Sequence, residues 1–268
     1  MKTTTNTVKT NKGGLNMNIN EYAATIAASI ENAEVVEVEK NGYIRTGIQF
    51  TTGERTKATF YINDLYKSGV DTEDAIEKAR EVVKKEQGKT IDVNFVDNFE
   101  SVRPRLRARL VNKRAATATT ISRSAAPHGF DDLIITAHIM VNVGNGEASI
   151  KVTSDIIKMW GVTSDLVLDI AEENSRKDAA IDPLPIPFPF TIVSNRNTCY
   201  GAYGIIAKMD EIRAKFPSGF TVIPSSVHEV LVTDILDKDA IDAMIQDVNR
   251  TEVNEVDLLS NHAYVFVA

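Results

Sequence analysis

Short β-rich runs and amphipathic helices alternate along the whole of this chain, and neither kind of segment dominates any large part of it. An Asn-Gly pair at 41–42 is the preferred two-residue turn of a hairpin and joins two such runs, 35–39 and 43–50. Ahead of them, apolar residues spaced by four from Tyr22 to Ile30 predict a short helix. This order predicts an α+β fold that begins with an N-terminal helix plus an antiparallel meander.

The chain divides by composition into four expected segments. Residues 1–18 hold almost nothing that a core can bury, which predicts a disordered tail, and Met17 is an alternative start residue. Residues 19–112 are predicted to form a helix-meander-helix unit, and residues 113–127, rich in Ala, Thr and Ser, a linker or loop. Residues 128–268 are predicted to form a larger, C-terminal mixed α/β unit with a hairpin, helices and further strands.

Four further stretches have less regular patterns. Apolar residues spaced by four predict a helix over 101–112, although the alternating arginines there would also suit a strand with one basic face. Residues 91–96 and 200–206 are rich in β-forming residues and predict strands. Four prolines within 178–189 predict an extended connector without regular structure.

A concentrated basic segment stands out in an otherwise acidic chain. The 268 residues carry a net charge of −7, yet residues 101–130 contain seven basic residues and no acidic one. Such a segment attracts phosphates or acidic partners unless the protein's own carboxylates neutralise it. The isoelectric point near 5.2 and the few neighbouring aromatic residues argue against general nucleic-acid binding. Anion or nucleic-acid contacts are expected from Arg103, Arg105, Arg107, Arg109, Lys113 and Arg114.

Ser226 and His228 are the most suggestive catalytic pair, because residues two apart in a strand point to the same face. No Gly-x-Ser-x-Gly elbow surrounds the serine, and Pro224 before it favours an ordinary turn. His262 is the other candidate. We therefore expect no catalytic residue, and a hydrolase that uses Ser226/His228 or His262 is an alternative.

Metal and cofactor sites have no signature in this sequence. The four histidines are not at metal-ligand spacing, and the single cysteine, Cys199, excludes a Cys₄ or Cys₂His₂ zinc site. A site assembled from His128, Asp131 and Asp132 stays open. No glycine motif for binding nucleotide phosphates is present, so we expect no cofactor. One cysteine and the absence of an apolar run of about 18 residues indicate a cytoplasmic protein without a membrane helix.

A set of stretches, most of them after residue 130, occurs in a distinctive order: 131–133, 158–162, 166, 171–174, 191–195, 201–202, 223–230, 248–251 and 258–264, with a weaker extension at 61–64. Together they resemble the bacterial domain-of-unknown-function family 5688. The resemblance implies a cytoplasmic α+β protein, often encoded on mobile elements of anaerobic bacteria, and it supplies no established activity. Two departures from the family pattern are Asn261, where an acid is expected beside the histidine, and the Ala/Thr-rich segment 114–127.

These observations favour a non-enzymatic function. We expect an accessory or regulatory interaction protein of a mobile element or phage, with inhibition of a host nucleic-acid-targeting defence system as one form of that role. A protein partner is expected, and no membrane partner. The acidic C-terminal third also fits a surface that imitates nucleic acid, whereas binding of nucleic acid through Arg103–Arg109 is the alternative.

Overall fold

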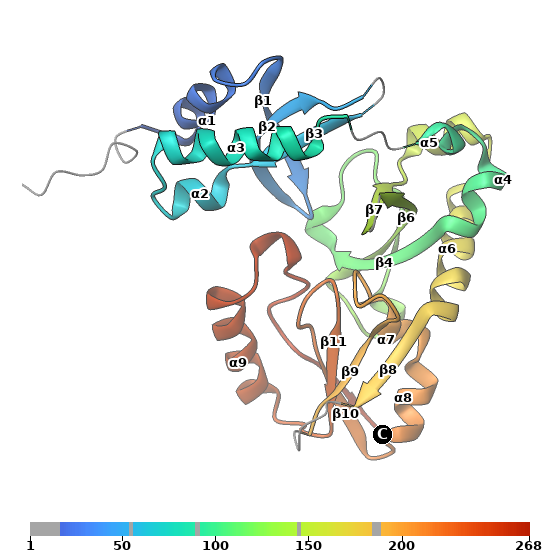
Figure 1. The fold of residues 1–268 in the computed structure, drawn as a ribbon. Helices are drawn as coiled ribbons and strands as arrows, with labels where there is room; N and C mark the ends of the chain where they lie inside the picture. The colour runs from blue at the N-terminus through green and yellow to red at the C-terminus, as the bar shows by residue number, and fades with distance from the viewer. Residues whose placement is uncertain (1–16, 54–55, 89–91, 144–145, 184–188) are drawn as a thin grey trace, which may run out of the picture. The chain divides into compact units, whose positions relative to one another are not determined.

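The computed structural model describes residues 17–53, 56–88, 92–143, 146–183 and 189–268 (Figure 1). The described residues divide into two compact units, those within 1–40 and 44–92 and those within 41–43 and 93–268. Helices occur together with antiparallel sheets, which confirms the predicted α+β class. Of the tail predicted at 1–18, only the last two residues are among those described.

The first unit is a three-stranded antiparallel sheet with helices packed against it, as the N-terminal helix and meander predicted. Its first helix begins at a capping box, in which the Asn18 side chain accepts from the backbone N–H of Glu21 at 3.0 Å. Tyr22 and Ile26 of that helix are fully buried in the core of the unit. The elements are α1 (Ile19–Ala28), β1 (Ala33–Lys40), β2 (Tyr43–Thr51), β3 (Lys57–Tyr61), α2 (Asn63–Lys67) and α3 (Thr72–Glu86).

The second unit contains two antiparallel sheets, and the first of them is centred on one long strand, β6 (Leu133–Val143). This strand pairs along one side with β4 (Leu106–Asn112) and along the other with β5 (Ser122–Ser124) and β7 (Gly146–Lys151). The predicted hairpin of β6 and β7 is therefore confirmed, although residues 144–145 of its turn lie outside the described part of the chain.

Helix α6 (Ser164–Asp178) covers the open edge of β4. The Ser175 hydroxyl accepts from the backbone N–H of Ala108 at 2.8 Å. The Asn174 amide donates to the backbone carbonyl of Leu106 at 3.2 Å. These bonds satisfy backbone groups that an edge strand otherwise leaves unpaired.

The second sheet has the strand order β12-β10-β11-β9-β8, and residues of both sheets share one buried core. Figure 1 shows α9 on one side of this sheet and α8 on the other. Its strands are β8 (Ala179–Pro183), β9 (Thr191–Asn195), β10 (Gly219–Ile223), β11 (Val230–Thr233) and β12 (Tyr264–Val267). The remaining helices are α4 (Phe99–Val102), α5 (Ser154–Trp160), α7 (Gly204–Ala207), α8 (Met209–Lys215) and α9 (Lys238–Thr251).

The helix predicted over 101–112 is wrong for most of its length. Helix α4 ends at Val102, a 3₁₀ turn follows at Arg103–Arg105, and β4 begins at Leu106. Pro104 lies in that 3₁₀ turn, where its missing N–H costs no helical hydrogen bond. The alternative of a strand with an arginine-bearing face is the arrangement that the chain adopts.

The unit boundary falls between Asp92 and Val93 rather than at residue 112. The expected strand at 91–96 is instead a 3₁₀ turn at Asn94–Asp97, and Ile91 lies outside the described residues. The expected linker at 113–127 contains β5 and the fully or nearly buried side chains of Ala115, Ile121 and Ala125. This segment is therefore part of the folded second unit.

Two expectations after residue 178 also need correction. The predicted connector at 178–189 begins with a regular strand, β8, and its residues 184–188 are not among those described. The predicted strand at 200–206 is an irregular segment followed by the short helix α7. Gly201 and Gly204 explain the difference, because their backbones approach Ser194 so closely that a Cβ atom would lie 2.4 Å from its Oγ and 2.6 Å from its carbonyl oxygen, respectively.

Candidate functional site

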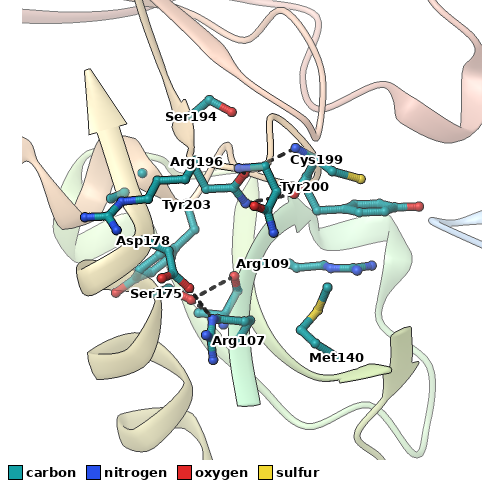
Figure 2. A pocket seen from close by; sticks show the side chains of 16 residues that line it. Arg107, Arg109, Met140, Ser175, Asp178, Ser194, Arg196, Cys199, Tyr200 and Tyr203 are labelled. Carbon is teal, nitrogen blue, oxygen red and sulfur yellow. Dashed lines mark hydrogen bonds and ion pairs between the residues drawn. The ribbon is translucent and has the colours of Figure 1, made fainter. Parts of the chain in front are cut away.

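A cavity of about 190 Å³ lies in the second unit, between β4, the end of α6 and the segment after β9 (Figure 2). Two arginines of the predicted basic segment, Arg107 and Arg109, are in its wall. They lie on the same face of β4 because they are two residues apart in a strand. The other wall residues come from segments far away in the sequence and include Met140, Asp178, Asn197, Cys199 and Tyr200.

Arg109 is the buried cation of this cavity, with only 7% of its surface exposed. Its Nη2 donates to the Ser149 hydroxyl at 2.7 Å, and its Cζ lies 3.5 Å from the centroid of the Tyr200 ring. Both partners are neutral, and no carboxylate contacts Arg109 within the described parts of the chain. Burial lowers the pKa of Arg109 to about 10, against the opposing effects of Tyr200 and Cys199.

The neighbouring strand adds no further charge beside Arg109. Thr136 is directly opposite Arg109 in β6, and its hydroxyl lies 3.2 Å from Nε2 of His138. Burial, together with the charges of Arg109 and Lys151, holds the pKa of His138 well below its usual value. His138 is therefore neutral near pH 7.

Arg107 differs from Arg109 because it already has a carboxylate partner. Its Nε lies 2.5 Å from Oδ2 of Asp178, the last residue of α6. Its Nη1 donates to the backbone carbonyls of Pro104 and Leu106, both at 2.9 Å. Arg107 is thus committed to contacts inside the protein.

The segment from Asn195 to Gly201 forms the opposite wall of the cavity. The side-chain carbonyl of Asn195 accepts from the backbone N–H groups of Asn197 at 3.1 Å and of Cys199 at 3.2 Å. Its amide donates to the carbonyl of Cys199 at 2.8 Å. Thr198 and Tyr200 have φ values of 50° and 53°, in the left-handed region that non-glycine residues rarely adopt. The side chain of Asn195 therefore holds the turn that presents Cys199 and Tyr200.

The Ser226 and His228 side chains do not form the catalytic pair that their spacing suggested. The Ser226 hydroxyl accepts from the backbone N–H of His228 at 3.1 Å, as in an ordinary turn. The ring Nδ1 of His228 accepts from the backbone N–H of Tyr200 at 3.1 Å, and its Nε2 lies 3.6 Å from Asp257. His228 thus supports the segment that lines the cavity.

His262 belongs to a separate cluster with Asp131 and Asp132, to which its Nε2 lies 3.6 Å and 3.9 Å away. Its Nδ1 lies 3.2 Å from the Ser260 hydroxyl, but that hydroxyl donates to Asp132 at 2.9 Å and the residue is 1% exposed. The structure thus joins Asp131 and Asp132 to His262 as a possible metal-ligand group, rather than to His128. The carboxylate of Asp132 already accepts from Ser260, Asn112 and Tyr264.

The rest of the basic segment is spread over several surroundings. Arg103, Arg105 and Lys113 are exposed, and Arg105 lies over the ring of Phe95 at 4.5 Å. Arg114 donates to the backbone carbonyl of Leu258 at 2.9 Å. The predicted anion-binding residues therefore do not share one environment, and Arg109 is the one that is buried at the cavity.

Sequence reasoning named Arg107 and Arg109 of the cavity wall but missed the third arginine there, Arg196, and the neighbours Asp178, Cys199 and Tyr200. A signal for the opposite wall was present in Asn195, a common turn residue, followed by Gly201 and Gly204. Nothing local in the sequence indicated that this turn would meet β4.

No helix among the described residues has both the length and the apolar character needed to cross a bilayer. No curated protein and no solved structure matches the sequence. The profile of DUF5688, a family of unknown function, matches residues 13–185 and 185–267, which agrees with the resemblance noted from the motifs. The chain belongs to the DUF5688 family.

Proposed function

We propose that this protein is a non-enzymatic binding protein that holds an anionic group of its ligand in the cavity beside Arg109. The observation that carries the proposal is a guanidinium that is 7% exposed and meets a hydroxyl and an aromatic ring but no described carboxylate. A buried charge without a counter-ion is costly for a folded protein. An anion that enters from the cavity would supply the missing counter-charge.

The accessibility of Arg109 from the cavity supports the same proposal. Arg109 lines the cavity, and none of its nitrogens is among the described buried side-chain atoms that lack a hydrogen-bond partner. Guanidinium N–H groups that are not used by Ser149 can therefore reach an incoming acceptor. A planar guanidinium binds carboxylate and phosphate oxygens through paired hydrogen bonds.

A binding function fits the side chains better than the hydrolase alternative does. His228 supports the segment that lines the cavity, the Ser226 hydroxyl accepts from the His228 backbone N–H, and Ser260 is buried and donates to Asp132. Neither serine hydroxyl therefore donates to a histidine ring as a nucleophile paired with its base would.

The cellular role of the protein and its partner are also matters of proposal. We propose a cytoplasmic protein that binds a protein partner. The anionic ligand is either a group of that partner or a separate molecule whose binding regulates the contact with the partner. A role on a mobile element or phage, including inhibition of a host defence system, rests on the family resemblance alone. The geometry favours the cavity over nucleic-acid binding through Arg103–Arg109, because Arg107 is paired with Asp178 and Arg109 is buried rather than displayed on an open surface.

The single cysteine provides a direct test of cavity occupancy. Cys199 is exposed and lines the cavity with Arg109, so a bound anion should hinder its alkylation by neutral iodoacetamide. We expect benzoate, at constant ionic strength, to slow the reaction about threefold at twice its Kd. Mass spectrometry of the Cys199 peptide gives the rate.

Arg109→Met should abolish this protection, because it removes the cation and keeps an apolar side chain of similar length. Arg105→Met is the matched control, since Arg105 is exposed and outside the cavity wall. Equal protection of Cys199 in Arg109→Met and wild type would overturn the proposal, as would no protection of the wild type by any anion tested.

A further inference from the structure

We propose that the cavity selects a carboxylate over a phosphate, and that Asp178 is the residue that sets this selectivity. The inference rests on the proposed function, because it concerns the kind of anion that Arg109 binds. It follows from the positive and negative groups in the cavity wall and from the ion pairs and hydrogen bonds that each of them already makes.

The wall carries one buried cation that is available to a ligand. Arg107 and Asp178 lie 2.5 Å apart and neutralise each other, while the other Arg107 bonds go to backbone carbonyls. Arg196 is exposed, and its guanidinium and that of Arg109 point in opposite directions in Figure 2. Arg109 therefore supplies the single positive charge that burial makes effective.

A carboxylate matches this single charge. It carries one negative charge, and its two oxygens lie in one plane at the spacing of two guanidinium N–H groups. When a carboxylate binds, its single negative charge neutralises the buried positive charge of Arg109. No unpaired negative charge is then left in the partly buried cavity. The cavity volume of about 190 Å³ suits a terminal group rather than a whole large ligand.

A phosphate fits the same site less well. A phosphate monoester or inorganic phosphate carries between one and two negative charges near pH 7, and the described wall offers its second charge no buried cation, because Arg107 is paired with Asp178 and Arg196 is exposed. The carboxylate of Asp178 faces the same cavity, and like charges there repel. The Asp178 side chain is 37% exposed, so water screens this repulsion only in part.

The test measures the apparent Kd of sodium acetate and of sodium phosphate from Cys199 protection, at pH 7.5 and constant ionic strength. For the wild type we expect acetate to bind about tenfold more tightly than phosphate. This factor is the approximate cost of the unpaired negative charge of phosphate when water partly screens it. Phosphate binding equal to or tighter than acetate binding would overturn the inference and leave the proposed function standing. Protection by neither anion would refute the proposed function itself.

Asp178→Asn should lower the preference for acetate several-fold by leaving Arg107 as a second available cation. Asp182→Asn is the matched control, because Asp182 is exposed on β8 and outside the cavity wall, and it should keep the wild-type ratio. The double variant Arg107→Gln/Asp178→Asn restores one net positive charge and should also keep that ratio. An unchanged ratio in Asp178→Asn would refute the role of Asp178.

If Asp178→Asn fails to fold, Arg107→Gln tests the role of Asp178 instead. The preference for acetate over phosphate should then change in the opposite direction. This variant leaves the Asp178 carboxylate without its partner, so the preference for acetate should rise. A preference that stays constant or falls in Arg107→Gln would overturn the inference.

Three sources could supply the carboxylate, and peptides distinguish them: a chain end, an acidic side chain or a small carboxylic acid. Protection by a short acetylated peptide with a free C-terminus, but not by its C-terminal amide, would identify a chain end. Protection by an acetylated, amidated peptide that contains glutamate would identify an acidic side chain. Protection by acetate and benzoate but by neither peptide would identify a small carboxylic acid.

Discussion

The guanidinium carbon of Arg109 lies 3.5 Å from the centroid of the Tyr200 ring, and this stacking joins the two walls of the cavity. Arg109 comes from a regular strand, whereas Tyr200 comes from an irregular turn with a φ of 53°. The Tyr200 N–H in turn donates to the ring of His228 at 3.1 Å. The buried cation is thus held by neutral groups, and its charge is left for a ligand.

Replacement of Arg109 by methionine should not destabilise the protein. A buried charge without a counter-ion is costly for the folded state, so its exchange for an apolar side chain of similar length should be neutral or stabilising. We expect Arg109→Met to unfold at the same or a higher urea concentration than wild type while it loses anion binding. The exposed Arg105→Met control should change the free energy of unfolding by less than about 0.5 kcal/mol. A large loss of stability in Arg109→Met would show that Arg109 has a structural role instead.

Alkaline pH should destabilise the protein through Tyr264. Burial raises the pKa of Tyr264, and its hydrogen bond to Asp132 acts in the same direction. Because the folded pKa exceeds the unfolded value of about 10, the unfolded chain loses the proton first, and stability falls as pH rises above 10. The slope is up to about 1.4 kcal/mol per pH unit for this one group.

Tyr264→Phe should therefore reduce the slope of stability against pH above pH 10, as measured by urea unfolding. At pH 7 the variant should be less stable by about 1–3 kcal/mol, because Asp132 loses one hydrogen-bond donor. Tyr61→Phe, at a half-buried tyrosine in the first unit, is the control. Equal alkaline slopes in Tyr264→Phe and wild type would contradict the assignment.

Gly201→Ala should distort the cavity. A Cβ atom at this position would lie 2.4 Å from Ser194 Oγ, 2.5 Å from the Asn195 nitrogen and 2.9 Å from the His228 carbonyl oxygen. Two of these atoms belong to the backbone and cannot rotate away, so we expect a loss of about 1–3 kcal/mol and weaker anion binding. Gly53→Ala is the control, because the nearest atom there is a threonine hydroxyl at 3.0 Å. Wild-type stability and binding in Gly201→Ala would contradict this reading of the turn.

Local structure was predicted correctly where it depends on one short motif of neighbouring residues. The Asn-Gly turn at 41–42 has positive φ values of 54° and 85°, as expected. The apolar spacing from Tyr22 to Ile30 likewise predicted α1, in which Tyr22 and Ile26 are buried. Each of these features depends on neighbouring residues only.

The segment 101–112 shows why other assignments failed. Leu106 and Leu110 are four residues apart, and this spacing places them on one face of a helix and equally on one face of a strand. Pairing with β6 decides between the two, and that pairing joins Leu106 to Ile139. The same limit applies to the cavity, because Asp178 and Tyr200 meet the β4 arginines only through the tertiary fold.

The most direct test of the account is a titration of the Arg109 side chain by nuclear magnetic resonance. The Nε–H signal of Arg109, assigned by its loss in Arg109→Met, is followed as sodium acetate is added at constant ionic strength. We predict that this signal shifts and saturates as for a single site, while the signal of the exposed Arg105 does not. An Arg109 signal that does not shift, or that shifts only as Arg105 does, would contradict the claim that Arg109 binds an anion in this cavity.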